Sequence, residues 1–120
     1  MSDYKNLPLW KKGMTLAHSV YAAVEMAGVK GSDAGKRLRK AVVSVPSLVG
    51  EAFLDLSGRD ADEALTLAES RLAEVARLLG EDAALASIGE AERAGILSDI
   101  NELQADLAGV RAARSGEAAH

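Results

Sequence analysis

The fold of this chain is decided by residues 33–56, which read DAGKRLRKAVVSVPSLVGEAFLDL. Apolar side chains recur there in steps of four and three, at Leu38, Val42, Val45, Val49, Ala52 and Leu56. This spacing places one apolar stripe along a helix, which suits packing against other helices at a shallow angle. Pro46 lies inside the stripe and removes one backbone hydrogen bond. We therefore expect one helix kinked at Pro46, and two short helices meeting at residues 44–46 are the alternative.

Two further helical segments lie on either side of this one. The first covers residues 8–27 and starts with a proline, whose missing N–H costs little in a first turn. The other starts at Asp60, where Glu63 three residues later completes a capping box. It ends at Gly80 or continues to about residue 84.

A fourth segment begins near residues 87–90, where a second Ser-x-x-Glu pattern occurs. Its periodicity stops before residue 115, so we expect a frayed tail and an ordered core over about residues 4–114. Connections are short, and no strand-like alternation competes with the helices. The sequence thus predicts a single all-α domain over residues 1–120, an antiparallel up-down-up-down four-helix bundle.

The amino-acid composition favours helices and excludes several classes of protein function. The 120 residues include 23 Ala and 16 Leu against nine Val and three Ile, a mixture that favours helix over strand. The absence of cysteine excludes a disulfide scaffold, a thiolate zinc site and thiol chemistry. There is no apolar run of membrane-spanning length and no signal-peptide pattern, so the sequence predicts a cytoplasmic protein without a membrane partner.

The net charge of −4 conceals an asymmetry between the two halves of the chain. Residues 1–50 hold eight Lys and Arg against three Asp and Glu, whereas residues 51–120 hold six against fifteen. The basic charge concentrates in one cluster on the second helix: Lys36, Arg37, Arg39 and Lys40. Two interpretations follow, a nucleic-acid surface or pairing with the acidic third and fourth helices of the same or a neighbouring subunit.

The second helix also resembles the signature of a known protein family. The similar stretches are residues 38–47 (LRKAVVSVPS), residues 51–53 (EAF), residues 9–13 (LWKKG), residues 20–21, and Ile88 with Glu90 and Glu92. They resemble the bacterial four-helix-bundle proteins encoded by intervening sequences in large-subunit rRNA genes, over about residues 4–110. Leu48 stands where that family usually has Asn, Gly50 and Ala52 exchange their usual order, and this chain is acidic where members are often basic.

The resemblance implies a self-assembling bundle, commonly a homopentameric ring, with a link to RNA or a ribonucleoprotein. Related bundles are accessory subunits of reverse transcriptases in diversity-generating retroelements. Independently of the family, apolar side chains on the first two helices extend beyond one stripe, which indicates a second surface to bury. We expect Trp10, Met14 and Val43 at this oligomer interface.

The remaining chemistry-bearing residues favour a non-catalytic role. A di-metal bundle needs Glu-x-x-His motifs, but Thr15 lies three residues before His18, so no metal site is expected. Lys40 and Ser44 have the types needed for a Ser–Lys dyad, yet no segment forms an oxyanion hole. Ser44 and Ser47 are better suited to hydrogen-bond backbone groups released by Pro46. We therefore expect no cofactor, no small-molecule substrate and no enzymatic activity, with a purely protein-binding module as the alternative to RNA association.

Overall fold

A computed structural model of the chain describes residues 6–54 and 59–118, with side chains described for residues 6–54 and 60–114. The elements are α1 (Pro8–Met26), α2 (Asp33–Leu54), α3 (Arg59–Glu81), the 3₁₀ turn η2 (Ala83–Leu85) and α4 (Glu90–Ala118). These residues contain no β-strand. The expected all-α, four-helix composition is therefore confirmed for the part of the chain that the structure describes.

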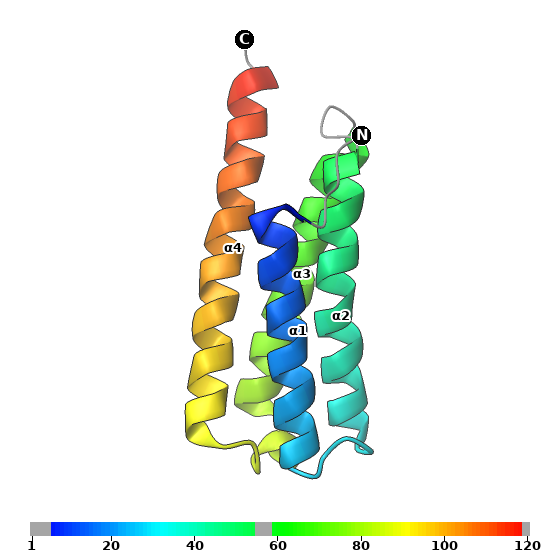
Figure 1. Ribbon diagram of the computed structural model, residues 1–120, viewed down its shortest axis with the longest axis vertical. Coiled ribbons are helices and arrows are strands. Elements are labelled where there is room, and N and C mark those ends of the chain that lie inside the picture. The colour runs from blue at the N-terminus through cyan, green and yellow to red at the C-terminus, as the bar shows by residue number, and fades with distance from the viewer. Residues whose placement is uncertain (1–5, 55–58, 119–120) are drawn as a thin grey trace.

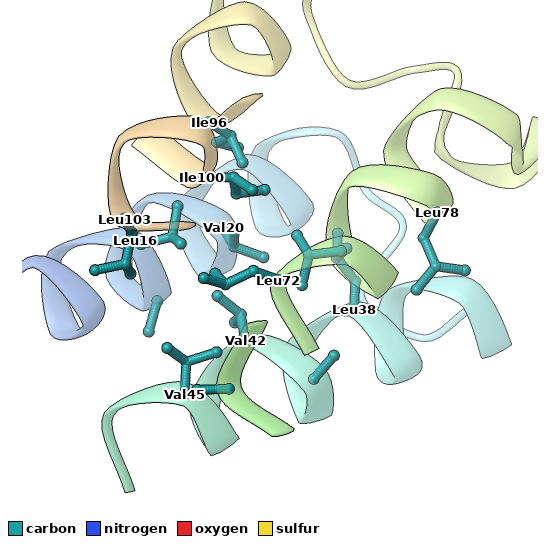
Figure 2. Packing of buried hydrophobic residues seen from close by; sticks show 14 of the residues in the cluster. Leu16, Val20, Leu38, Val42, Val45, Leu72, Leu78, Ile96, Ile100 and Leu103 are labelled. Atoms are coloured by element: carbon teal, nitrogen blue, oxygen red, sulfur yellow. The ribbon is translucent and has the colours of Figure 1, made fainter. Parts of the chain in front are cut away.

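The helices enclose one apolar interior. α1 and α3 each pack against both α2 and α4, and the α1–α2 and α3–α4 connections lie at the same end of the molecule (Figure 1). Side chains from all four helices point into the shared core, among them Leu16, Val42, Leu72 and Ile100 (Figure 2). The α2 stripe from Leu38 to Ala52 is fully buried, while Leu56 lies outside the described residues.

Some helix ends differ from the sequence-based expectation. α3 begins one residue before Asp60, which lies in the first turn instead of preceding it, and Gly80 is inside the helix. α4 begins at Glu90, and Ser87 donates its hydroxyl to the Ala27 carbonyl at 3.3 Å instead of capping the helix. The α4 backbone also continues through Ala118, past the expected frayed end at residue 115.

The link between α1 and α2 is a tight turn built around one carbonyl. Gly28 has φ +72°, which favours glycine. The Ser32 amide and hydroxyl both donate to the Val29 carbonyl, at 3.1 and 2.7 Å. The Ser32 oxygen in turn accepts the Gly35 N–H at 2.9 Å and caps the start of α2. A Cβ on Gly35 would lie 2.1 Å from the Val29 oxygen, so only glycine fits there.

The link between α3 and α4 is held by two polar side chains. Asp82 accepts the Ala84 N–H at 2.9 Å and caps η2. Arg93, on the second turn of α4, donates to the carbonyls of Leu85 and Ile88 at 2.8 and 3.3 Å. The guanidinium thus fixes the turn that precedes its own helix.

Pro46 lies within α2, which is one continuous helix, so the alternative of two short helices is wrong. Pro46 is buried, and a Cβ placed on Gly13 of α1 would lie 3.5 Å from it. α1 and α2 therefore approach closely where a small residue faces the proline ring. Ser44 donates to the Ala41 carbonyl at 2.6 Å, whereas Ser47 is exposed. Pro46 removes the amide partner of a different carbonyl, that of Val42. Ser44 therefore does not hydrogen-bond the backbone group that the proline releases.

Candidate nucleic-acid interface

Three of the four basic residues predicted on α2 are exposed. The side chains of Lys36, Arg37 and Lys40 all face solvent. Within residues 6–54 and 59–114, no carboxylate lies within ion-pairing distance of any of them. Pairing of this cluster with acidic helices of the same chain is therefore not seen. Three positive charges remain on one helix surface, available to an anionic partner.

Arg39 has a different role from its neighbours. Its guanidinium donates to the Lys30 carbonyl at 2.8 Å and to the Gly35 carbonyl at 3.4 Å. The same group lies 5.9 Å from the centre of the Tyr21 ring, within the range of a cation–π contact. Arg39 is half-buried, and its hydrogen bonds hold the α1–α2 turn against α2. Its role is therefore structural, and it is less available to a partner than Lys36, Arg37 and Lys40.

A groove of about 340 Å³ runs between α2 and α3 beside the exposed cations. Arg37 and Lys40 line it from α2, and Arg71 and Glu74 line it from α3. Arg71 and Glu74 form an ion pair at 3.5 Å, one turn apart on the same helix. The groove thus brings together three cations and one carboxylate.

Arg71 is the contributor that sequence reasoning missed. It directly precedes Leu72, a buried residue of the α3 stripe, and it emerges at the edge of that stripe toward α2. The usable signal was the adjacency of the second and third helices in the chain, joined by a short connection. Residues that border two facing stripes meet across the boundary between the helices.

The acidic side chains of α3 and α4 pair with other cations. Lys12 of α1 lies 3.2 Å from Glu102 and 2.6 Å from Asp106. Arg111 lies 2.6 Å from Glu69, and Arg114 pairs with Asp62. These bridges join α4 to both of its neighbours. The hydrogen bonds from Lys12 to Asp106 and then to Glu102 raise the pKa of the Lys12 ammonium above 10.5.

The predicted oligomer interface is partly exposed. Trp10 and Met14 are half-buried on α1, and Trp10 packs against the core. Val43 of α2 is 44% exposed, and Tyr21 of α1 is 41% exposed. Tyr21 lies seven residues after Met14 and eleven residues after Trp10, so the three side chains share one face of α1. Apolar surface therefore remains uncovered on both helices of this face.

Catalytic and metal-binding arrangements are not assembled by the described residues. The Ser44 hydroxyl is engaged with the Ala41 carbonyl and hydrogen-bonds no lysine. His18 is exposed, and no three His, Asp or Glu side chains gather in the described ranges as a metal site would require. None of the described helices has the length and apolarity to cross a lipid bilayer.

Residues 6–54 and 59–118 thus form four helices, with a basic surface on α2 and a cationic groove beside it. Comparison with protein-family models, curated proteins and solved structures gives no match.

Proposed function

We propose that this protein is a non-catalytic assembly protein that forms homo-oligomers and associates with RNA or a ribonucleoprotein through α2. One observation carries the RNA contact: Lys36, Arg37 and Lys40 are exposed and lack acidic partners within the described chain, although the chain is acidic overall. Unneutralised cations on a rigid helix are the usual means of contacting phosphates. The resemblance to bundles encoded in rRNA genes supports the same partner.

Self-association is supported by the exposed apolar side chains on α1 and α2. Tyr21 and Val43 are each more than two-fifths exposed, and the half-buried Trp10 and Met14 lie on α1 as well. Aromatic residues of this kind are common anchors of protein interfaces. We propose this face as the contact between subunits, and the pentameric ring is the stoichiometry that the resemblance implies.

The proposed architecture of each subunit is an up-down-up-down bundle with α2 kinked at Pro46. The positions of the connections in Figure 1 support the topology, and the missing N–H of Pro46 supports the kink. We retain the expected cytoplasmic location as part of the proposal, and cell fractionation would test it.

The RNA contact is tested by measuring binding to RNA and to duplex DNA at 50 and 200 mM salt. We expect binding that weakens steeply with salt and is lost in the double variant Lys36→Glu/Arg37→Glu. The control is Lys11→Glu/Arg77→Glu, which makes the same change of charge at exposed positions of α1 and α3, where Arg77 lies 3.9 Å from Glu81. No binding by the unmodified protein at low salt would overturn the RNA proposal, as would equal losses in both variants.

Self-association is tested by size-exclusion chromatography with light scattering. We expect an oligomer at micromolar concentration that dissociates when Val43→Asp places a charge on the apolar face. A monomeric unmodified protein would overturn the assembly proposal.

A second candidate function is a purely self-assembling module in which the α2 cations meet carboxylates of a neighbouring subunit. Glu63 and Asp99 favour it, because both are exposed and form no ion pair within the described chain. In that case Lys36→Glu/Arg37→Glu reduces the oligomer mass, and the unmodified protein does not bind RNA.

A further inference from the structure

We infer that the groove between α2 and α3 is the part of the surface that binds RNA, and that it contacts the phosphate backbone of a duplex. This inference rests on the function proposed above and makes it specific. It adds Arg71 of α3 as a contact residue and Glu74 as a residue that weakens the contact. Neither is part of the basic cluster in the sequence of α2.

Cations from two helices converge on the groove. Arg37 and Lys40 reach the groove from α2, and Arg71 reaches it from the facing side of α3. Arg37 and Arg71 carry planar guanidinium groups that donate in pairs to phosphate oxygens. Cations on both sides of the groove can contact the same phosphate or two successive phosphates. Cations in a row on a single helix are less able to do so.

The groove lies between two helices that are fixed by the core. Its walls are helices whose inner residues Leu38 and Leu72 are fully buried in the same core. Ala41 and Ser44 form the part of the wall between the cations, and the Ser44 hydroxyl is already bonded to the backbone. The backbone positions that carry the α2 and α3 cations are therefore fixed before any partner binds, so only the side chains have to be ordered on binding.

Glu74 is placed to oppose the contact. Its carboxylate lies 3.5 Å from Arg71 and lines the same groove. It neutralises part of the charge on Arg71 and repels phosphate directly. If the groove binds phosphate, removal of this one negative charge strengthens binding.

The described residues that line the groove include no aromatic side chain, which favours a duplex over a single strand. Single-strand binding surfaces combine cations with aromatic residues on which bases stack. Tyr21 of α1 lies against Arg39 and is not among the residues that line the groove. Positive charge without a stacking partner recognises the backbone and not the bases.

The test measures affinity for a 20-base-pair RNA duplex, and for one of its strands, between 50 and 200 mM salt. Four phosphate contacts for each engaged subunit, from Lys36, Arg37, Lys40 and Arg71, predict a salt slope near −3.6, so affinity falls about 150-fold over this range. Arg71→Ala removes one contact, and the fall shrinks to about 40-fold. Glu74→Gln is expected to tighten binding a few-fold, and Lys11→Ala, a matched loss of one exposed cation on α1, leaves the slope unchanged.

The outcomes separate this inference from the proposal beneath it. If Lys36→Glu/Arg37→Glu abolishes RNA binding while Arg71→Ala behaves like Lys11→Ala, the RNA contact stands and the groove assignment is wrong. Tighter binding of the single strand than of the duplex overturns the duplex assignment. If the unmodified protein binds neither RNA, both the proposed function and this inference fail. Circular dichroism spectra that match the unmodified protein show that each variant is folded.

Discussion

Replacing Gly35 by alanine is expected to destabilise the protein, against the usual effect of this change in a helix. Alanine normally stabilises a helix by up to about 1 kcal/mol relative to glycine. At Gly35, however, the new Cβ would lie 2.1 Å from the carbonyl oxygen of Val29 and 3.1 Å from the Ser32 hydroxyl. The first of these atoms belongs to the backbone, so the α1–α2 turn itself must move.

The size of the effect follows from the hydrogen bonds that depend on this turn. The Val29 carbonyl accepts from both the amide and the hydroxyl of Ser32, and Ser32 caps α2 through the Gly35 amide. Each such bond contributes about 1 kcal/mol. Loss of all three, set against a gain of up to about 1 kcal/mol in helix propensity, leaves a net loss of about 2 kcal/mol.

Thermal and urea unfolding followed by circular dichroism measure this difference. For a domain of this size, Gly35→Ala should lower Tm by roughly 6–10 °C. The control is Gly95→Ala inside α4, where nothing lies within 4 Å of the added Cβ, and it should raise Tm by roughly 3–5 °C. If Gly35→Ala stabilises the protein as Gly95→Ala does, the close approach of the turn to α2 is wrong.

Three further changes test the core, the α1–α2 contact and the α1–α4 contact. Leu72→Ala should cost about 2–5 kcal/mol in urea unfolding because Leu72 is fully buried, and a loss below half a kcal/mol would contradict the α3 stripe. Gly13→Ala should stabilise the protein by about 1 kcal/mol, since the new Cβ would sit at an ordinary 3.5 Å from Pro46; a loss would mean that the two helices cannot admit a methyl group. Folding raises the pKa of Lys12, so its ion pairs stabilise the protein fully below pH 10.5, and this contribution disappears as the pH rises through the raised value. Unfolding scans between pH 9 and 12 should show a decline that Lys12→Met lacks, and the same decline in both proteins would contradict the assignment.

The sequence was sufficient for the helices because local patterns specify them. Steps of four and three predicted the buried face of α2, and every described member of that stripe is buried. The helix starts were predicted less accurately. Ser87 was expected to cap α4, but its hydroxyl donates instead to the carbonyl of Ala27, sixty residues earlier in the chain. A capping motif depends on whether a distant carbonyl competes for the same hydroxyl, and a local pattern does not contain that information.

The candidate site was less predictable than the fold, since it depends on which side chains meet between helices. The basic cluster of α2 was visible in the sequence, but the separate role of Arg39 was not, because its partners are carbonyls of a turn. The acidic residues were visible too, yet their pairing with Lys12 and Arg111 depends on the rotation of each helix about its axis. The position of Arg71 in the groove also depends on the rotation of α3 about its axis, which the sequence does not specify.

The bridge from Lys12 to Asp106 joins positions that are 94 residues apart, and this separation bears on the order in which the chain folds. Neighbouring helices meet after closure of short connections, whereas the contact of the first helix with the last closes most of the chain into a loop, at an entropic cost that grows with loop length. We therefore expect the pairings of α1 with α2, of α2 with α3 and of α3 with α4 to precede the contact between α1 and α4. By the same reasoning, the α1–α4 contact should be the first to open in the native protein, and the amide hydrogens of α1 and α4 should exchange with solvent ahead of those of α2.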